Sequence, residues 1–116
     1  MKNSHPHFVI LLLTIAYLTV PRPLDATPAP ENGSQTDNYP NGNPRLETRY
    51  KNGRIIRKKT FYKNGNVFMD CTYKNKRLTS KKTFYETGRL QSRWNSKSGI
   101  TQFYDENGNL ETELKE

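Results

Sequence analysis

The sequence predicts an all-β fold: a single-layer antiparallel meander of β-hairpin repeats, with about 23 residues per two-strand repeat. The pentapeptide KKTFY occupies residues 58–62 and returns unchanged at residues 81–85, which sets this period. A fixed period of this size is typical of repeat architectures. An aromatic residue, a glycine turn and an aliphatic residue also recur in that order, twice within each period. The stretches between these turns are rich in Val, Ile, Thr, Phe and Tyr, which favour strands.

Five turns of related sequence mark the ends of the expected strands. Asn-Gly is the strongest short-range hairpin signal, because both central residues of a type I′ turn need positive φ. One turn has Lys76 where glycine is expected, so we predict a different turn type there. The stretch from Asn95 to Gly99 is irregular and lacks the tyrosine. The five turns occupy residues 50–53, 62–65, 73–76, 85–88 and 104–108.

Between the turns we expect six or seven strands over about residues 45–114, each alternating its side chains between two faces. The alternation assigns Ile55, Arg57, Lys59 and Phe61 to one face. The matching face of the following strands would receive Val67, Met69, Cys71 and Tyr73, then Leu78, Ser80, Lys82 and Phe84, then Leu90, Ser92 and Trp94. The acidic final strand, residues 110–114, would discourage pairing between sheet edges.

The N-terminal part divides into a leader and a linker. The apolar run at residues 8–20 is too short to span a bilayer comfortably and suits the core of a secretory signal. We therefore expect a signal peptide over residues 1–26, ending at Ala26, with an uncleaved anchor as the alternative. Residues 27–44 are rich in Pro, Asn, Gly, Ser and Thr and predict a disordered linker, although residues 39–42 already resemble the later turns. The repeat domain then covers residues 45–116.

The phased turns resemble the MORN-repeat variant family, which is widespread in bacteria. The resemblance covers most of the mature chain and implies a sheet of hairpins without catalytic residues. Members of the family are commonly labelled antitoxin-like components or exported proteins, so the resemblance adds an antitoxin-like or immunity-like role as an expectation. The matching residues are Tyr50, Asn52, Gly53 and Ile55; Tyr62, Asn64, Gly65 and Val67; Tyr85, Gly88 and Leu90; and Tyr104, Asn107, Gly108 and Leu110.

The residue types argue against catalysis. The only histidines, His5 and His7, lie in the expected leader, so imidazole acid/base and metal chemistry would be missing from the mature chain. No Cys/His cluster suits zinc, and no Gly-rich strand-to-helix loop suits a nucleotide. We predict no enzyme, no cofactor and no metal site. Cys71, the only cysteine, is either a thiol packed on a strand or one half of an intermolecular disulfide.

The charge distribution predicts a binding surface. The chain carries a net charge of +8, and residues 45–97 hold sixteen Lys or Arg against three acidic residues. Repetition on neighbouring hairpins would align these cations with the aromatic residues of the repeat. A solvated basic face that keeps the sheet soluble is the plain alternative. The candidate binding face consists of Arg57, Lys58, Lys59, Phe61, Lys81, Lys82, Phe84 and Trp94.

Two classes of partner fit such a face. We expect an exported, non-enzymatic repeat module in the periplasm, on the cell surface or secreted, which binds an unidentified protein partner. The alternative is an envelope-associated module held by charge on an anionic membrane surface or polymer. Nucleic acid ranks third, because the aromatic residues belong to the repeat pattern itself and an exported protein meets little nucleic acid.

Overall fold

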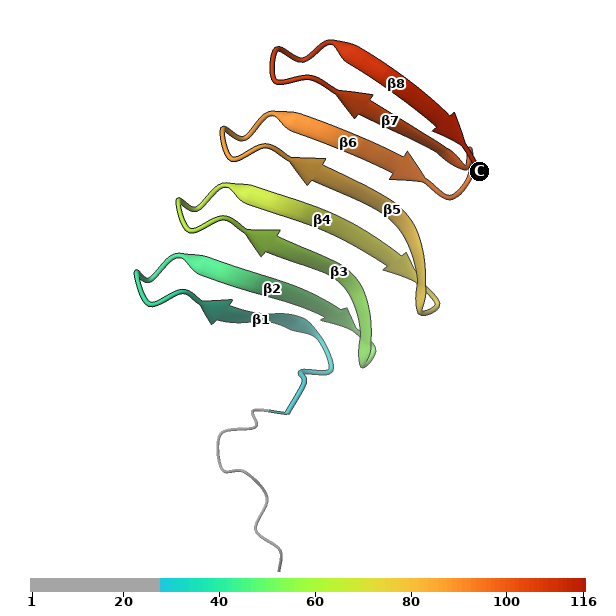
Figure 1. Ribbon diagram of the computed structural model, residues 1–116. Helices are drawn as coiled ribbons and strands as arrows, with labels where there is room; N and C mark the ends of the chain where they lie inside the picture. The colour runs from blue at the N-terminus through green and yellow to red at the C-terminus, as the bar shows by residue number, and fades with distance from the viewer. Residues whose placement is uncertain (1–27) are drawn as a thin grey trace, which may run out of the picture.

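The computed structural model describes residues 28–116, so the leader expected at residues 1–26 lies outside the described residues. Eight β-strands follow one another and form one antiparallel sheet in sequence order (Figure 1). Within residues 28–116 there is no helix. The predicted single-layer antiparallel meander is therefore confirmed. The strands are β1 (Gly33–Asn38), β2 (Pro44–Lys51), β3 (Arg54–Phe61), β4 (Val67–Lys74), β5 (Arg77–Phe84), β6 (Leu90–Asn95), β7 (Ile100–Tyr104) and β8 (Leu110–Lys115).

The first strand corrects the expected start of the domain. Strand β1 lies inside residues 27–44, which were expected to be disordered, so the sheet begins before residue 45 and has eight strands instead of six or seven. Its sequence GSQTDN contains no apolar residue and therefore looks like linker. Order comes from backbone pairing with β2 and from the following Tyr39, whose hydroxyl donates to the Phe61 carbonyl at 2.7 Å. The resemblance of residues 39–42 to the later turns is confirmed.

Two kinds of turn alternate from β1 to β6, one kind on each side of the sheet. The turn that joins β6 to β7 differs, as its irregular sequence predicted: residues 96–99 lie between the paired Asn95 and Ile100, and the Gly99 N–H donates to the Asn95 carbonyl at 2.9 Å. On the short-turn side, Asn52 and Gly53 have φ angles of 50° and 71°, and Asn75 and Lys76 have φ angles of 50° and 66°. Positive φ at both central residues is the geometry of a type I′ turn. Lys76 therefore adopts the same kind of turn as Gly53, and the different turn type predicted for it was wrong.

The turns on the other side, here called the tyrosine side, are wider. In residues 62–66 the Tyr62 N–H donates to the Asn66 carbonyl at 2.8 Å, and the Gly65 N–H donates to the Tyr62 carbonyl at 3.0 Å. Within this turn only Gly65 has a positive φ, of 93°, as in a type I turn followed by one left-handed residue. The same bond pattern joins β1 to β2, β5 to β6 and β7 to β8. The type I′ turn predicted from Asn-Gly was therefore wrong on this side.

Tyrosine hydroxyls on the tyrosine side tie each hairpin to the next. The side-chain amides of Asn64 and Asn66 reinforce this link, because both donate to the Glu86 carbonyl of the following turn, at 3.0 and 2.8 Å. The sheet is thus a chain of equivalent contacts between neighbouring repeats, whose stability is a sum of local terms. The hydroxyl bonds run from Tyr39 to the Phe61 carbonyl, from Tyr62 to the Phe84 carbonyl and from Tyr85 to the Tyr104 carbonyl, each 2.7 Å long.

The last turn replaces the tyrosine by Asp105. Its carboxylate accepts the backbone N–H groups of Asn109 and Asn107, at 2.8 and 2.9 Å. These bonds, led by the one from Asn109, hold the pKa of Asp105 below its usual value. The Asp105 turn therefore satisfies its own backbone N–H groups and lacks the tyrosine hydroxyl bond that the turns at Tyr39, Tyr62 and Tyr85 make.

The pairing register decides which side chains share a face. Residues directly opposite each other on neighbouring strands point to the same face. Lys58 lies opposite Cys71, whereas Lys59 lies opposite Asp70. The expected grouping of Lys59 with Cys71 was therefore wrong. A one-residue difference in pairing register moves a whole strand's side chains to the other face, and turn length together with bulges sets that register.

Bulges at the strand ends add a second correction. Between β2 and β3 the register shifts, so that Arg49 lies opposite Arg57 while Tyr50 lies opposite Ile55. Ile56 is the extra residue of this bulge. Ile55 consequently lies on the face opposite to Arg57, although simple alternation had placed them together. The equivalent shift between β4 and β5 separates Leu78 from Ser80 in the same way.

The sheet buries few side chains completely. Among the described residues, Cys71 at 5 % exposure and Thr48 at 6 % are the two that are buried, and neither is completely enclosed. Both share the face of Lys58, since Thr48 and Cys71 lie opposite that lysine on its two flanking strands. Most other strand side chains are half-buried, as expected for one layer with both faces open to solvent.

Candidate binding surfaces

The structure divides the predicted binding face between the two faces of the sheet. Consecutive residues of a strand point to opposite faces, so a run such as residues 57–59 cannot share one. Lys58, Lys81 and Trp94 lie on one face, named here the Trp94 face, in a transverse row with Cys71. The other face, named the Arg57 face, carries Arg57, Lys59, Phe61, Lys82 and Phe84.

The Trp94 face combines apolar side chains with two lysines, and one of these, Lys81, shares a hollow with Glu116. Between β2 and β7 its register positions include Lys58 and Lys81 but no carboxylate. A hollow of about 360 Å³ on this face is lined by Leu78, Lys81, Thr83, Ser92, Trp94, Thr101, Phe103 and Glu116. A second hollow, of about 440 Å³, is lined by Ala29, Tyr50, Gly53, Arg54, Ile55, Lys58, Tyr73 and Lys76.

Cys71 lies between these two hollows. Lys58 and Lys81 are its directly opposite neighbours on β3 and β5. Burial raises the pKa of the Cys71 thiol, against the opposing influence of Lys81. A thiol in this setting is protonated at neutral pH and poorly nucleophilic. Of the two alternatives drawn from the sequence, the buried position matches a thiol packed on a strand.

The Arg57 face neutralises part of its charge internally. The Arg57 guanidinium donates two hydrogen bonds to the Asp70 carboxylate, from Nε at 2.8 Å and from a terminal nitrogen at 2.6 Å. These bonds hold the pKa of Asp70 below its usual value, and the nearby ammonium groups of Lys59 and Lys82 act in the same direction. The Asp70 side chain is only 13 % exposed, so the pair is partly shielded from solvent.

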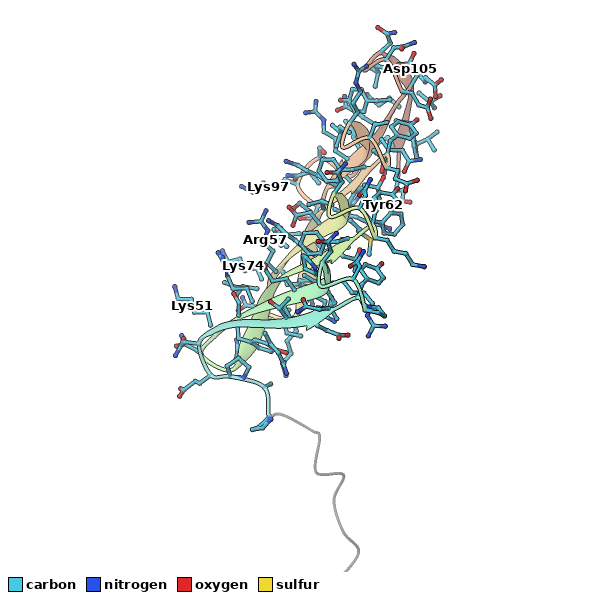
Figure 2. All side chains as sticks on the ribbon, turned by 90° about the vertical axis from the view of Figure 1, so that its left-hand side faces the viewer. Lys51, Arg57, Tyr62, Lys74, Lys97 and Asp105 are labelled. Carbon is cyan, nitrogen blue, oxygen red and sulfur yellow. The ribbon has the colours of Figure 1, made fainter. Side chains whose placement is uncertain are left out.

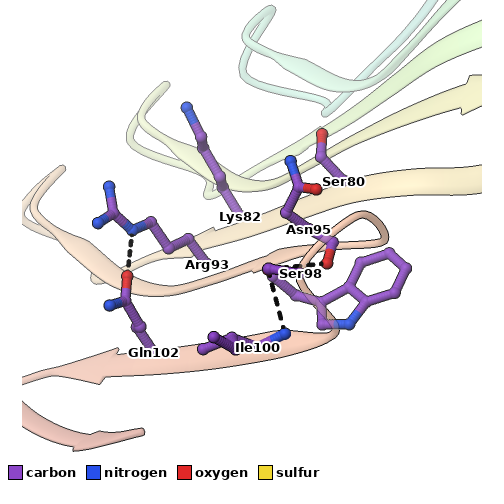
Figure 3. A pocket seen from close by; sticks show the side chains of 8 residues that line it. Ser80, Lys82, Arg93, Asn95, Ser98, Ile100 and Gln102 are labelled. Carbon is purple, nitrogen blue, oxygen red and sulfur yellow. Dashed lines mark hydrogen bonds between the residues drawn. The ribbon is translucent and has the colours of Figure 1, made fainter. Parts of the chain in front are cut away.

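A polar hollow of about 450 Å³ opens on the Arg57 face near the turn that joins β6 to β7 (Figure 3). Within it, Arg93 Nε donates to Gln102 Oε1 at 2.6 Å, and Gln102 Nε2 donates to Glu113 at 2.8 Å. The hollow can bind a polar or anionic group, but no histidine or other general base converges on a nucleophile there. Its lining residues are Ser80, Lys82, Arg93, Trp94, Asn95, Ser98, Ile100 and Gln102.

A third basic surface runs along the short-turn side and was not part of the predicted set. Figure 2 shows Lys51, Lys74 and Lys97 in a line along one side of the sheet, away from Tyr62 and Asp105. The sequence already indicated this surface, because each of these three lysines follows the previous one by one full period of the repeat. We name this surface the basic rim; it consists of Lys51, Arg54, Lys74, Lys76, Arg77 and Lys97, all exposed.

The described part of the chain offers no clustered metal ligands. Among residues 28–116, no group of three His, Cys, Asp or Glu residues could hold a metal ion. None of these residues belongs to an apolar helix of the length needed to cross a membrane.

The fold and its surfaces define a class of protein: an open, single-sheet β-hairpin repeat protein with broad faces and shallow hollows. A family model described as "MORN repeat variant" matches residues 31–52, 57–75 and 97–115, together just over half of the chain. The chain therefore belongs to the MORN repeat variant family. Residues 76–96 lie outside the matched segments, yet their turn at Tyr85 has the same backbone bonds and the same kind of tyrosine hydroxyl bond as its counterpart at Tyr62.

Other comparisons add little. No curated protein matches the chain. A solved chain titled "Crystal structure of GtfA/B complex bound to UDP and GlcNAc" is similar at 14 % identity with a TM-score of 0.36. The similarity covers 85 % of this chain and 26 % of that chain. A likeness at this level carries no argument about function.

Proposed function

We propose that this protein is a non-enzymatic binding module that holds a protein partner on the Trp94 face. The supporting observation is the composition of that face, where half-buried aromatic and aliphatic side chains surround Lys58 and Lys81 without a carboxylate on the strands from β2 to β7. Tyr and Trp are the residue types that most often anchor protein interfaces. The partner chemistry that fits is a protein segment presenting apolar side chains beside carboxylates.

The finer parts of the proposal rest on other support. The expected leader supports export, and the resemblance to antitoxin-like repeat proteins supports a partner that the module neutralises. The absence of histidine from residues 28–116 supports a non-enzymatic role, because no imidazole is then present to act as a general base.

The sheet supplies a matched pair of variants to test the proposal. Lys58→Thr/Lys81→Thr removes two charges from the Trp94 face, whereas Lys59→Thr/Lys82→Thr removes two charges from the adjacent positions on the Arg57 face. Threonine is a strong strand former, so both variants keep the local preference for β structure. The assay is capture of the partner from the native host at moderate salt, followed by titration of the purified partner.

The Trp94-face variant is expected to weaken partner binding at least tenfold, and the Arg57-face variant to leave it within about twofold. An interface anchored by aromatic residues should also persist as salt is raised. Equal loss in the two variants would overturn the assignment of the face. Binding only to anionic vesicles or polymers, fading steeply with salt, would favour the envelope-associated alternative.

A further inference from the structure

The basic rim repeats with the period of the sheet. Successive short turns are two strands apart, which corresponds to a spacing of about 10 Å along the rim. Lys51, Lys74 and Lys97 belong to three successive turns, so their attachment points span about 20 Å. Because the sheet is one layer thick, the turns form a single file (Figure 2).

Like charges face each other across the first two of these turns. Lys51 is paired directly with Arg54, and Lys74 directly with Arg77. Like charges in directly opposite positions destabilise a sheet. Among the described residues the salt bridges are Arg45–Asp37 and Arg57–Asp70, so no rim cation forms an ion pair with an acidic side chain.

The acidic groups nearest the rim lie at its ends. The Glu31 carbonyl accepts the Gly53 N–H, and the Glu116 N–H donates to the Gly99 carbonyl. These bonds place Glu31 and Glu116 beside the first and last short turns. The middle turn, which carries Lys74, Lys76 and Arg77, has no such neighbour among the described residues. An unneutralised cation cluster repeated in phase suits an anion that also has several charges in a row.

The backbone conformation of Lys76 is an independent indication that positive charge at the rim has a function. Its φ of 66° lies in the left-handed region that side chains other than those of Asn and Asp rarely adopt. Gly53 occupies the equivalent position of the preceding turn at a φ of 71°. The middle turn thus carries a lysine where glycine would relieve the backbone. Departures of this kind from local preference are expected at functional sites.

We propose that the basic rim binds a linear polyanion, meaning a polymer chain that carries phosphate or sulfate groups, and that Lys76 strengthens this binding. A single file of cations matches one polymer chain laid across three turns. The turns contain Lys, Asn, Gly, Arg and Ser but no apolar side chain that could insert into a bilayer. The basic rim borders the Trp94 face, because Arg54 and Lys76 also line the second hollow there. Its test uses purified polymers and therefore does not depend on a protein partner.

The decisive variant is Lys76→Gly, made in the full chain. Binding to inorganic polyphosphate and to heparin is measured between about 50 and 200 mM salt, with the unfolding midpoint measured in parallel. For six cations the plot of log K against log salt should have a slope of about −4. Lys76→Gly should weaken binding about fivefold and reduce the slope by about 0.7, yet raise the unfolding midpoint because the strained φ is relieved.

Lys63→Ser is the matched control, because it removes one exposed lysine from a turn on the tyrosine side. It should leave polyanion binding within about twofold of the original protein. Equal weakening by the two variants would overturn the proposal in favour of net charge alone. Failure to bind either polymer at low salt would also overturn it. So would Lys76-dependent binding of phosphatidylserine vesicles without polymer binding, which would assign the rim to a membrane. Binding of only one polymer would support the proposal and identify phosphate or sulfate as the ligand chemistry.

Discussion

The tyrosine bonds between hairpins give the most direct test of how the sheet is stabilised. In Tyr62→Phe the ring is kept, and the hydroxyl that donates to the Phe84 carbonyl at 2.7 Å is removed. The carbonyl then loses a partner while the aromatic packing stays. A net hydrogen bond of this kind contributes about 1 kcal/mol. For a domain of this size the loss should lower Tm by about 4–8 °C.

The assay is urea and thermal unfolding followed by the fluorescence of Trp94, the only tryptophan. Tyr50→Phe is the control, because Tyr50 lies on the Trp94 face and its hydroxyl makes no hydrogen bond among the described residues. It should change stability by less than about 0.5 kcal/mol.

The repeat makes the test sharper. The equivalent bonds of Tyr39 and Tyr85 are about one repeat away, so the three losses should add to about 3 kcal/mol in the triple variant. A Tyr62→Phe variant as stable as Tyr50→Phe, or a triple variant no worse than a single one, would refute the idea that these hydroxyls couple the hairpins.

Two further predictions concern titrating groups. Asp70→Asn should destabilise the protein by about 1 kcal/mol at neutral pH, since it breaks a partly exposed pair with Arg57. Because the folded-state pKa of Asp70 is lowered, its contribution is present above about pH 4 and is lost as pH falls through the folded value, so the variant's stability should fall less steeply in acid. In the folded protein Cys71 should react with iodoacetamide much more slowly than in the protein unfolded in urea. Equal rates in the two states would contradict the burial of Cys71.

Much of the fold was predictable because the same local turn and strand patterns recur in every repeat. The KKTFY copies, the glycine turns and the alternating strands led to the confirmed meander. Prediction failed where the local signal was ambiguous. Asn-Gly occurs in both kinds of turn: Asn52-Gly53 forms the two-residue turn, whereas Asn64-Gly65 forms the wider one.

Prediction also failed where order comes from a neighbour. Strand β1 has a linker-like composition and is held by pairing with β2. Lys76 keeps the turn type of a glycine because the flanking strands β4 and β5 impose it. Neither effect can be read from the residues concerned, because the stabilising groups lie elsewhere in the chain.

The sequence by itself determined the period, the strand class and the amount of positive charge. Only the tertiary structure decided which of those charges act together. Lys58 and Lys59 are adjacent in sequence yet lie on opposite faces, whereas Lys51, Lys74 and Lys97 are far apart in the chain yet lie in one line along the same side of the sheet. The physical reason is that strand side chains alternate with a period of two, so a single bulge or a change of turn length reassigns a whole strand to the other face.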